Sequence, residues 1–218
     1  MSAEQAPDAE RPRGRASQRP TGVVLDGLIA AGVAQARSGG PDAVVLREAT
    51  RAVGVSPNAA YRYFTDRDAL LAAVAWEAMS MLALRMERGV AAVPNRHGTV
   101  RGARARLHAI GDAYLSFARD EPGLFRTAFA GSARTHTARA QVGPTGAPAR
   151  TPMDILDAAL DELVLAGALP PTRRAHATAL AWATVHGVAV LRLSGTIGDR
   201  DTPAALDRAV TMFIQRGL

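Results

Sequence analysis

The side chains best suited to chemistry lie close together in one short segment, residues 56–64 (SPNAAYRYF). Asn58 can donate and accept hydrogen bonds at a base edge, and Arg62 can reach a guanine or a phosphate. The hydroxyls of Tyr61 and Tyr63 can contact phosphate oxygens. Such donors at this spacing are typical of a surface that binds DNA, and they require a short helix to present them.

The sequence around these residues contains the signals for such a helix and for a second helix before it. Gly54 can adopt the positive φ of a tight turn, and Ser56 followed by Pro57 is typical of a helix start. Apolar residues at helical spacing form the buried sides of both helices, and one more packs in the corner between them: Leu46, Ala49, Val53, Val55, Ala60 and Phe64. The pattern predicts a helix-turn-helix, whose second helix reads base edges with its N-terminal residues.

Helical periodicity covers most of the chain, and strand alternation is absent. Helices are expected at residues 21 to about 38, 46–53, 56–64, 67–93, 99–119, 122–130, 153–166, 172–193 and 202–216. Glycine and proline recur over 131–152, which predicts a mobile loop. The sequence therefore predicts an all-α fold: a disordered arm with four arginines (1–20), an N-terminal three-helix helix-turn-helix DNA-binding domain (21–66), and a C-terminal helical bundle for ligand binding and dimerisation (67–218).

The head segment resembles the tetracycline-repressor (TetR) family over residues 21–72. The run Gly54-Val55-Ser56 is followed, at the family's spacing, by Tyr61, Tyr63-Phe64, Arg67-Asp68 and Leu70-Leu71. The chain departs from the family pattern at Asn58, where glycine is frequent, at Ala49, where a larger aliphatic residue is usual, and at Arg67, where lysine is usual. The resemblance implies a homodimeric repressor whose helical body binds a small molecule and then releases double-stranded operator DNA.

From the motif and the resemblance, nine residues are expected to contact DNA: Arg47, Ser56, Pro57, Asn58, Ala59, Tyr61, Arg62, Tyr63 and Arg67. The phosphate contact of Arg67 is implied by the resemblance alone. Positive charge is not confined to this region, because nine arginines accompany five acidic residues over 11–71 and nine accompany three over 96–150. We expect the second excess to be a solvated surface and loop.

A second similarity lies in the body. The run from Trp182 to Gly187 (WATVHG) is similar to a Trp…His-Gly signature of one subgroup of TetR-type C-terminal domains, and Phe125 and Phe129 fit that subgroup's short helix. Nine residues are candidates to line an apolar ligand pocket: Trp76, Met79, Met86, Tyr114, Phe117, Phe125, Phe129, Trp182 and His186. The alternative is that most of them are plain core. His186 is then a buried histidine with a satisfied hydrogen bond, and otherwise the polar group that orients a ligand.

Composition disfavours other kinds of site. The 218 residues contain no cysteine, and all 26 basic residues are arginine, so thiolate chemistry and a lysine-based phosphate loop are excluded. Metal-ligand spacing is absent among His97, His108, His136, His176 and His186. A solvated polar helix face is expected for Glu121, Asp154, Asp157, Asp161 and Glu162. The sequence therefore predicts neither an enzyme nor a cofactor.

Location and assembly follow from the apolar segments. Residues 1–20 lack the apolar core of a signal peptide, and the longest uncharged stretch, between Arg174 and Arg192, is shorter than the roughly 20 residues of a membrane span. We expect a cytoplasmic protein without membrane contact.

The helix at 172–193 is apolar on nearly all sides, and the last helix carries a stripe of Leu206, Val210, Phe213 and Ile214. These two helices are expected to form a homodimer interface.

Two other functions remain open at this point. One is an all-helical dimeric small-molecule-binding protein without DNA binding, and the other is an enzyme built on a helical bundle. Tyr61, Tyr63 and Arg67 favour DNA binding over the first alternative. The second lacks any acid–base or nucleophile arrangement. The long helix from Arg67 is expected to carry a ligand-induced tilt from Trp76 to the head.

Overall fold

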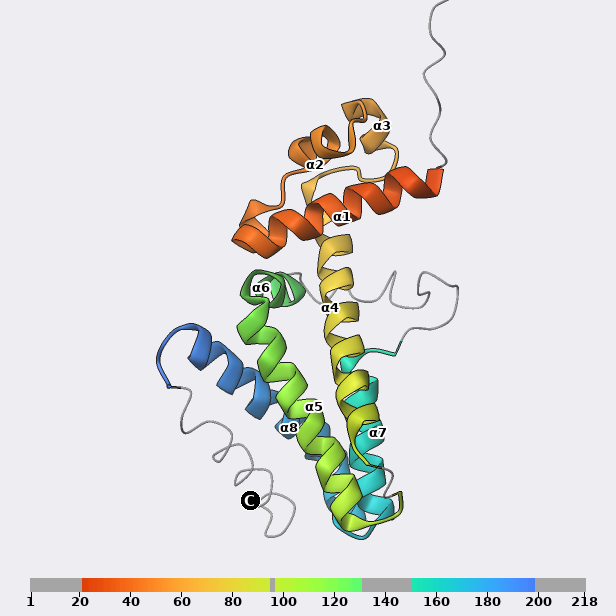
Figure 1. The fold of residues 1–218 in the computed structure, drawn as a ribbon, viewed down its shortest axis with the longest axis vertical. Coiled ribbons are helices and arrows are strands. Elements are labelled where there is room, and N and C mark those ends of the chain that lie inside the picture. Colours follow the sequence, from red (N-terminus) through yellow and green to blue (C-terminus); the bar gives the residue numbers. More distant parts are fainter. Residues whose placement is uncertain (1–20, 95–96, 131–149, 199–218) are drawn as a thin grey trace, which may run out of the picture.

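The computed structural model describes residues 21–94, 97–130 and 150–198, and within these ranges every regular element is helical (Figure 1). The elements are α1 (Thr21–Gly39), the 3-10 helix η1 (Pro41–Ala43), α2 (Leu46–Val53), α3 (Pro57–Tyr61), α4 (Arg67–Ala92), α5 (Val100–Asp120), α6 (Pro122–Ala130), α7 (Pro152–Leu165) and α8 (Pro171–Leu193). The predicted all-α fold is confirmed. The arm at 1–20, nearly all of the predicted loop at 131–152 and the helix at 202–216 lie outside the described residues.

Local capping explains where the helices begin. The Ser56 hydroxyl accepts a hydrogen bond from the Ala59 N–H, and the Asp66 carboxylate accepts one from the Ala69 N–H at 2.8 Å. These bonds satisfy amide groups that have no partner inside the helix. Gly54 ends α2 with a φ of 71°, the left-handed conformation that its lack of a Cβ atom permits. The signals predicted for the helix-turn-helix are therefore confirmed at the level of the backbone.

Two local features of the head differ from expectation. The second helix of the motif was expected to reach Phe64, but α3 ends at Tyr61. The N–H groups of Tyr63 and Phe64 still bond to the Ala60 carbonyl, at 2.9 and 3.0 Å, so the chain continues as a tight turn. The 3-10 turn η1 was not predicted. It follows Gly40, whose φ of 79° sharply redirects the chain after α1.

The helix α4 joins the head to the body. It starts beneath α1 and runs along the length of the molecule, with α5 and α7 beside it and α6 beneath the C-terminal end of α1 (Figure 1). Although α4 is long and apolar enough to cross a membrane by composition, it packs against α1, α5, α6 and α7. One continuous apolar core, extending from Val24 to Ala189, therefore includes both head and body.

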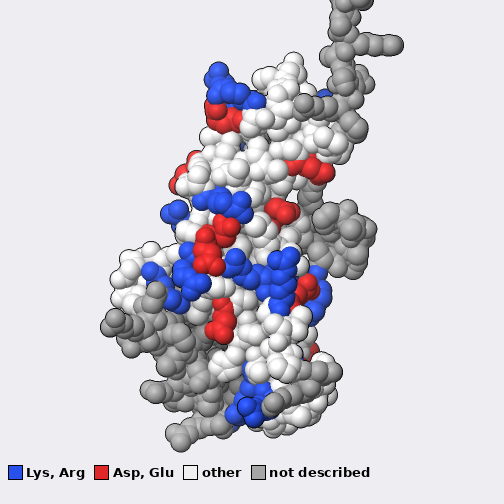
Figure 2. Space-filling model, in the orientation of Figure 1, with Lys and Arg blue, Asp and Glu red and all other residues white. Residues whose placement is uncertain are grey.

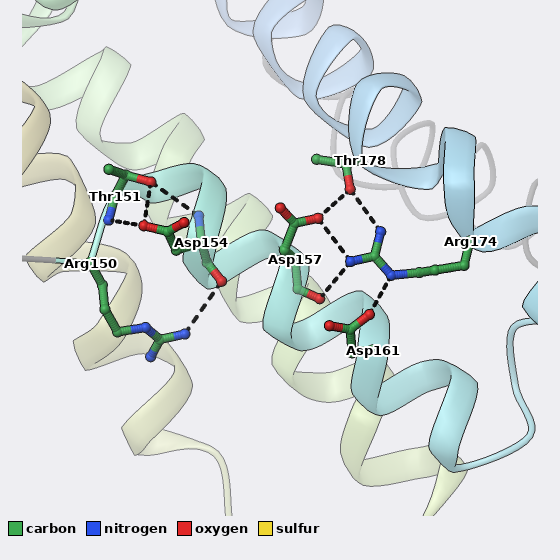
Figure 3. Close-up of polar contacts among 7 residues, drawn as sticks. All are labelled: Arg150, Thr151, Asp154, Asp157, Asp161, Arg174 and Thr178. Carbon is green, nitrogen blue, oxygen red and sulfur yellow. Dashed lines mark hydrogen bonds and ion pairs between the residues drawn. The ribbon is translucent and has the colours of Figure 1, made fainter. Parts of the chain in front are cut away.

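The first half of α8 is fastened to α7 by a polar network (Figure 3). The Arg174 guanidinium donates to the carboxylates of Asp157 and Asp161, at 2.8 and 2.5 Å, and the Thr178 hydroxyl also donates to Asp157. The pKa of Arg174 is raised by these hydrogen bonds, first of all by the one to Asp161. The carboxylates of Asp157 and Asp161 are 41% and 62% exposed, as expected for a solvated face, and they also hold two helices together.

The other acidic residues assigned to that face also have polar partners, which the prediction did not include. Glu162 receives a bidentate hydrogen bond from the buried Arg106 of α5, and Glu121 pairs with Arg37 of α1 at 2.8 Å. Asp154 closes a capping box at the start of α7 (Figure 3). Helical periodicity places these groups on a polar face, but it does not reveal the arginines that come to them from other helices.

Candidate DNA-binding surface and ligand site

The predicted DNA-binding residues mostly share one exposed surface around α2 and α3. The side chains of Ser56, Pro57, Asn58 and Arg62 are exposed, and Tyr61 is 57% exposed. Arg47, from the start of α2, is exposed as well, whereas Ala59 and Tyr63 are half-buried. The position of Asn58 in the first turn of α3 is that of a residue that reads base edges.

Four long polar side chains on this surface have no partner among the residues that the structure describes. Within the described residues, the side chains of Arg47, Asn58, Tyr61 and Arg62 make no hydrogen bond or ion pair. Arg51 is different, because its guanidinium lies 2.5 Å from the Glu48 carboxylate. A guanidinium without a protein partner is available to phosphate or to a guanine edge without first breaking an ion pair.

Arg67 has a structural role that sequence reasoning missed. Its Nε and Nη2 atoms donate to the backbone carbonyls of Val44 and Pro41, at 2.9 and 2.7 Å, and Nη1 lies 3.5 Å from the Asp68 carboxylate. The first turn of α4 therefore fastens the connection between α1 and α2. The phosphate contact implied by the family resemblance stays a prediction for this arginine, since most of its donors are already in use.

Gln35 is a second positioning residue that the sequence did not reveal. Its amide oxygen accepts from the Val45 N–H at 2.9 Å, and its amide nitrogen donates to the Val45 carbonyl at 3.4 Å. These two bonds fix the chain directly before α2 against α1. The partners are ten residues apart across an irregular connection, so no periodic pattern could have predicted the pair.

In the body, five of the nine predicted ligand residues form one aromatic cluster. The rings of Phe129 and His186 lie 4.7 Å apart between centroids, and those of Tyr114 and Trp182 lie 5.3 Å apart. Phe125 joins them, 5.0 Å from Phe129. The cluster brings α5, α6 and α8 together, with edge-on and tilted ring geometries that aromatic pairs favour.

One hydrogen bond crosses the cluster, between the Tyr114 hydroxyl and Nδ1 of His186 at 2.8 Å. Burial raises the pKa of Tyr114 and lowers the pKa of His186, so both groups are neutral at pH 7. The phenol has no other acceptor among the described residues. We therefore assign Nδ1 as the acceptor, which places the imidazole proton on Nε2.

Two small apolar cavities adjoin the cluster. The first, of about 40 Å³, is lined by Met86, Tyr114 and Trp182 among others. The second, of about 170 Å³, is lined by Trp76, Met79, Trp182 and the start of α7. Trp182 borders both, and both fall below the roughly 300 Å³ of an ordinary ligand pocket.

The remaining predicted ligand residue, Phe117, lies apart from these cavities. It is 1% exposed, and its ring centroid lies 5.6 Å from the guanidinium carbon of Arg85. Its surroundings are those of a core residue, so the structure does not bring it together with the other eight. Several cavity-lining residues were missed: Leu107, Ile110, Leu156 and Val185. Helical spacing from Tyr114 and Trp182 is the signal that could have found three of them.

The head and the body meet tightly at α6. A Cβ atom added to Gly123 would lie only 2.2 Å from the backbone oxygen of Ala36, so this part of α6 touches the backbone of α1. The nearby ion pair between Glu121 and Arg37 strengthens the junction. Because the same helix carries Phe125 into the aromatic cluster, α6 contacts both that cluster and helix α1 of the head.

Surface charge on the body is mixed. On the face shown in Figure 2, basic and acidic side chains are interspersed along the molecule, without a large patch of one sign. Ion pairs account for part of this pattern, including those that join Arg85 and Arg119 to Asp120. The hydrogen bonds from these arginines, Arg85 first, lower the pKa of Asp120. The arginine excess of the body is thus partly neutralised by local partners.

A helix-turn-helix head with unpaired donors, joined to an all-helical body, defines a DNA-binding transcriptional regulator. Residues 28–74 match the sequence model of the bacterial regulatory proteins of the tetR family, and residues 107–214 match that of the tetracyclin repressor-like C-terminal domain. The chain belongs to the TetR family.

One solved structure has the same overall architecture as this chain, and a second is more distantly similar. A protein of unknown function from Rhodococcus sp. RHA1 is 26% identical, with a TM-score of 0.66 over 94% of this chain and 99% of its own. A protein from Mesorhizobium loti MAFF303099, described as a TetR-family transcriptional regulator, is 16% identical, with a TM-score of 0.48 over 92% of this chain and 98% of its own. No curated protein matches the chain significantly.

Proposed function

We propose that this regulator is a repressor that leaves its operator when a small apolar or aromatic ligand binds its body. The observation that carries the proposal is the double contact of α6. One part of the helix packs Phe125 and Phe129 against His186, and another part packs Gly123 against the backbone of α1. A ligand that displaces the aromatic rings would therefore move a helix that touches the DNA-binding head.

A second connection runs along α4. Trp76 and Met79 line the 170 Å³ cavity, and Arg67, in the first turn of the same helix, holds the carbonyls of Pro41 and Val44 before α2. A tilt of α4 would displace these carbonyls and with them the start of α2. Two distinct sites joined by rigid helices meet the structural requirement for allosteric coupling, for which about 1–3 kcal/mol is typical.

For the DNA contacts, we propose direct base reading by Asn58 and phosphate binding by Arg47, Arg62, Tyr61 and Tyr63. Asn58, Arg47, Arg62 and Tyr61 are exposed and have no partner among the described residues, which supports these roles. Backbone contacts are the proposed roles of Ser56, Pro57 and Ala59 at the start of α3. This surface also favours a DNA-binding regulator over the alternative of a dimeric binding protein without DNA.

We propose a homodimer that uses α8. Among the described residues of α8, Ala179 and Ala183 are exposed, and Leu191 is 42% exposed. This apolar face is suited to a second copy of the chain, which would supply a second recognition helix about 34 Å away or at a longer spacing. The predicted contribution of residues 206–214 lies outside the described residues. A cytoplasmic location, without cofactor or catalysis, is part of the same proposal.

The test uses a labelled duplex with the sequence upstream of the protein's own gene. We expect tight, saturable binding by fluorescence anisotropy at fixed salt, and weaker binding to a scrambled duplex. Apolar and aromatic compounds are then screened by the fluorescence of Trp76 and Trp182. A compound that binds should lower the affinity for the duplex. By linkage, the operator should lower the protein's affinity for that compound by the same factor. Equal compound affinity with and without the operator would refute the ligand-responsive part of the proposal.

A further inference from the structure

A third hollow, open to the surface, lies beside the aromatic cluster. It measures about 400 Å³, which is within the range of small-molecule sites. It is lined by Phe125, Arg126, Phe129, His186, Val190, Leu193 and Ser194, from α6 and the end of α8. The walls are largely aromatic and aliphatic, and none of these lining residues is acidic.

Two hydrogen-bond donors remain for a ligand in this hollow. His186 uses Nδ1 for Tyr114, and its Nε2–H has no acceptor among the residues that the structure describes. Arg126 is exposed, and its guanidinium makes no hydrogen bond or ion pair within the described residues. Ser194 adds no free donor, because its hydroxyl donates to the Leu191 carbonyl at 3.0 Å. A site with a cation and an N–H, and without an anion, favours an acceptor group with negative charge.

We propose that this hollow binds an amphipathic anion: an aromatic or aliphatic body that carries one carboxylate or sulfonate, bound by Arg126 and the Nε2–H of His186. The proposal names the ligand class of the ligand-responsive function proposed above and rests on it. The rings of Phe125 and Phe129 receive the apolar body of the ligand.

The place of Arg126 connects this site to the head. A Cβ atom added at Gly40 would lie 3.3 Å from Nη2 of Arg126, so the guanidinium rests against this glycine at the end of α1. An anion that draws the guanidinium into the hollow removes that contact. The ligand's charge, and not only its apolar body, then acts on the junction between α1 and η1.

The other large hollow of the body does not offer the same chemistry. It measures about 360 Å³ and lies between α4, α5 and α7, near Arg106 and Glu162. These two charges already bind each other through a bidentate hydrogen bond, and Arg150 at its edge lies 3.9 Å from the Glu87 carboxylate. Its positive groups therefore have protein partners, whereas Arg126 has none among the described residues.

The experiment compares two fluorescent probes that differ by one charged group, 8-anilinonaphthalene-1-sulfonate and the uncharged N-phenyl-1-naphthylamine. With the full chain, we expect the sulfonate probe to bind about tenfold more tightly than the neutral probe, as a charge-assisted hydrogen bond predicts. Arg126→Gln should remove this difference by weakening the sulfonate probe alone. His186→Leu should weaken the sulfonate probe severalfold.

The matched control is Arg88→Gln, which removes another exposed arginine without a described partner, on α4 away from the hollow. It should leave both affinities unchanged. Equal affinities of the two probes for the unmodified protein, equal losses for both probes in Arg126→Gln, or the same loss in Arg88→Gln would each overturn the proposal. Thermal unfolding of each variant without probe checks that the fold is retained.

Operator release separates this proposal from the one on which it rests. If the sulfonate probe binds through Arg126 but leaves operator binding unchanged, the anion site stands and ligand-responsive repression fails. If neutral compounds release the operator while anionic compounds bind no better than neutral ones, the repressor stands and the anion site fails.

Discussion

The head and the body differ in what their functional side chains do before any partner binds. In the head, Asn58 and Arg62 are exposed and have no partner among the described residues. In the body, Tyr114 and His186 bond to each other, inside a cluster of contacting rings. The head therefore presents a preformed surface, whereas the interior of the body is filled by its own side chains.

This difference suits the two partners. DNA is a large polyanion, and donors without a protein partner can bind it without first breaking an internal ion pair. A small molecule that enters the two interior cavities, of about 40 and 170 Å³, has to displace side chains or helices. If the displaced arrangement binds the ligand better than the closed one, the ligand favours the displaced conformation. Because the interior is largely filled, ligand binding there would shift helices that contact the head.

The largest expected effect distinguishes the ion pairs of the two regions. Glu162→Gln leaves the buried guanidinium of Arg106 without its carboxylate, so we expect a loss of about 3 kcal/mol in the free energy of unfolding at pH 7. The control is Glu48→Gln in the head, whose exposed pair with Arg51 should contribute less than about 1 kcal/mol. Urea denaturation of both variants provides the measurement. Equal losses of unfolding free energy would show that the ion pair of the body stabilises the fold no more than the exposed pair of the head.

The same variant has a defined pH dependence. The hydrogen bond from Arg106 lowers the pKa of Glu162 in the folded protein. A carboxyl group with a lowered folded pKa stabilises the fold fully above its unfolded pKa of about 4.3, and this stability is lost as the pH falls through the folded pKa. The stability difference between the protein and Glu162→Gln should therefore shrink below about pH 4. A constant difference down to pH 3 would contradict this account.

The second prediction concerns the junction between the regions. Gly123→Ala places a methyl group against the Ala36 carbonyl, so α6 must move away from α1, at an expected cost of about 2 kcal/mol. Operator affinity should change as well, because α1 belongs to the head and loses its close contact with α6. Gly22→Ala, which meets nothing within 4 Å on the same helix α1, is the control and should not destabilise the protein. A destabilised Gly123→Ala variant with unchanged operator affinity would argue against α6 as the connecting element.

The third prediction distinguishes contacts within the head. Arg62→Ala should weaken binding to all duplexes alike, by about tenfold, and should reduce the salt slope by about one. Asn58→Ala should instead relax specificity at one base pair, with a loss of about 1–3 kcal/mol on the preferred sequence. Anisotropy titrations at several salt concentrations, on operator and scrambled duplexes, separate the two behaviours. The opposite assignment would follow if Asn58→Ala weakened all duplexes equally.

Sequence reasoning succeeded where a structure is determined by neighbours along the chain. Gly54, Ser56 and Asp66 act on groups within four residues, so their turn and caps could be predicted. The bonds of Gln35 to Val45 and of Arg67 to Pro41 connect residues 10 and 26 positions apart, and they escaped prediction. Local physics thus gave the elements of the head, but not the bonds that position them.

In the body, residue type and helical period identified eight of the residues that surround the cavities, since large aromatic and sulfur-containing side chains are rarely placed elsewhere. The ninth, Phe117, lies apart from them in the core, because period alone does not say which neighbour covers each side of a buried helix. The partner of Glu162 was missed for the same reason. Its partner Arg106 lies 56 residues away, and only the packing of α5 on α7 brings the two together.

The smallest expected effects come from removing one tyrosine hydroxyl in the body and one in the head. Tyr114→Phe removes the hydroxyl that donates to His186, so we expect a loss of about 1 kcal/mol in unfolding free energy without a direct effect on DNA contacts. Tyr61→Phe removes an exposed hydroxyl that has no partner among the described residues, so stability should be unchanged while operator affinity falls a few fold. Urea denaturation and anisotropy measure the unfolding free energy and the operator affinity of each variant. We expect Tyr114→Phe to change the first quantity only, and Tyr61→Phe to change the second only. If Tyr61→Phe destabilised the fold and spared DNA binding, the head would not be the preformed surface described above. If Tyr114→Phe left stability unchanged, the hydrogen bond to His186 would not be part of what holds the aromatic cluster closed.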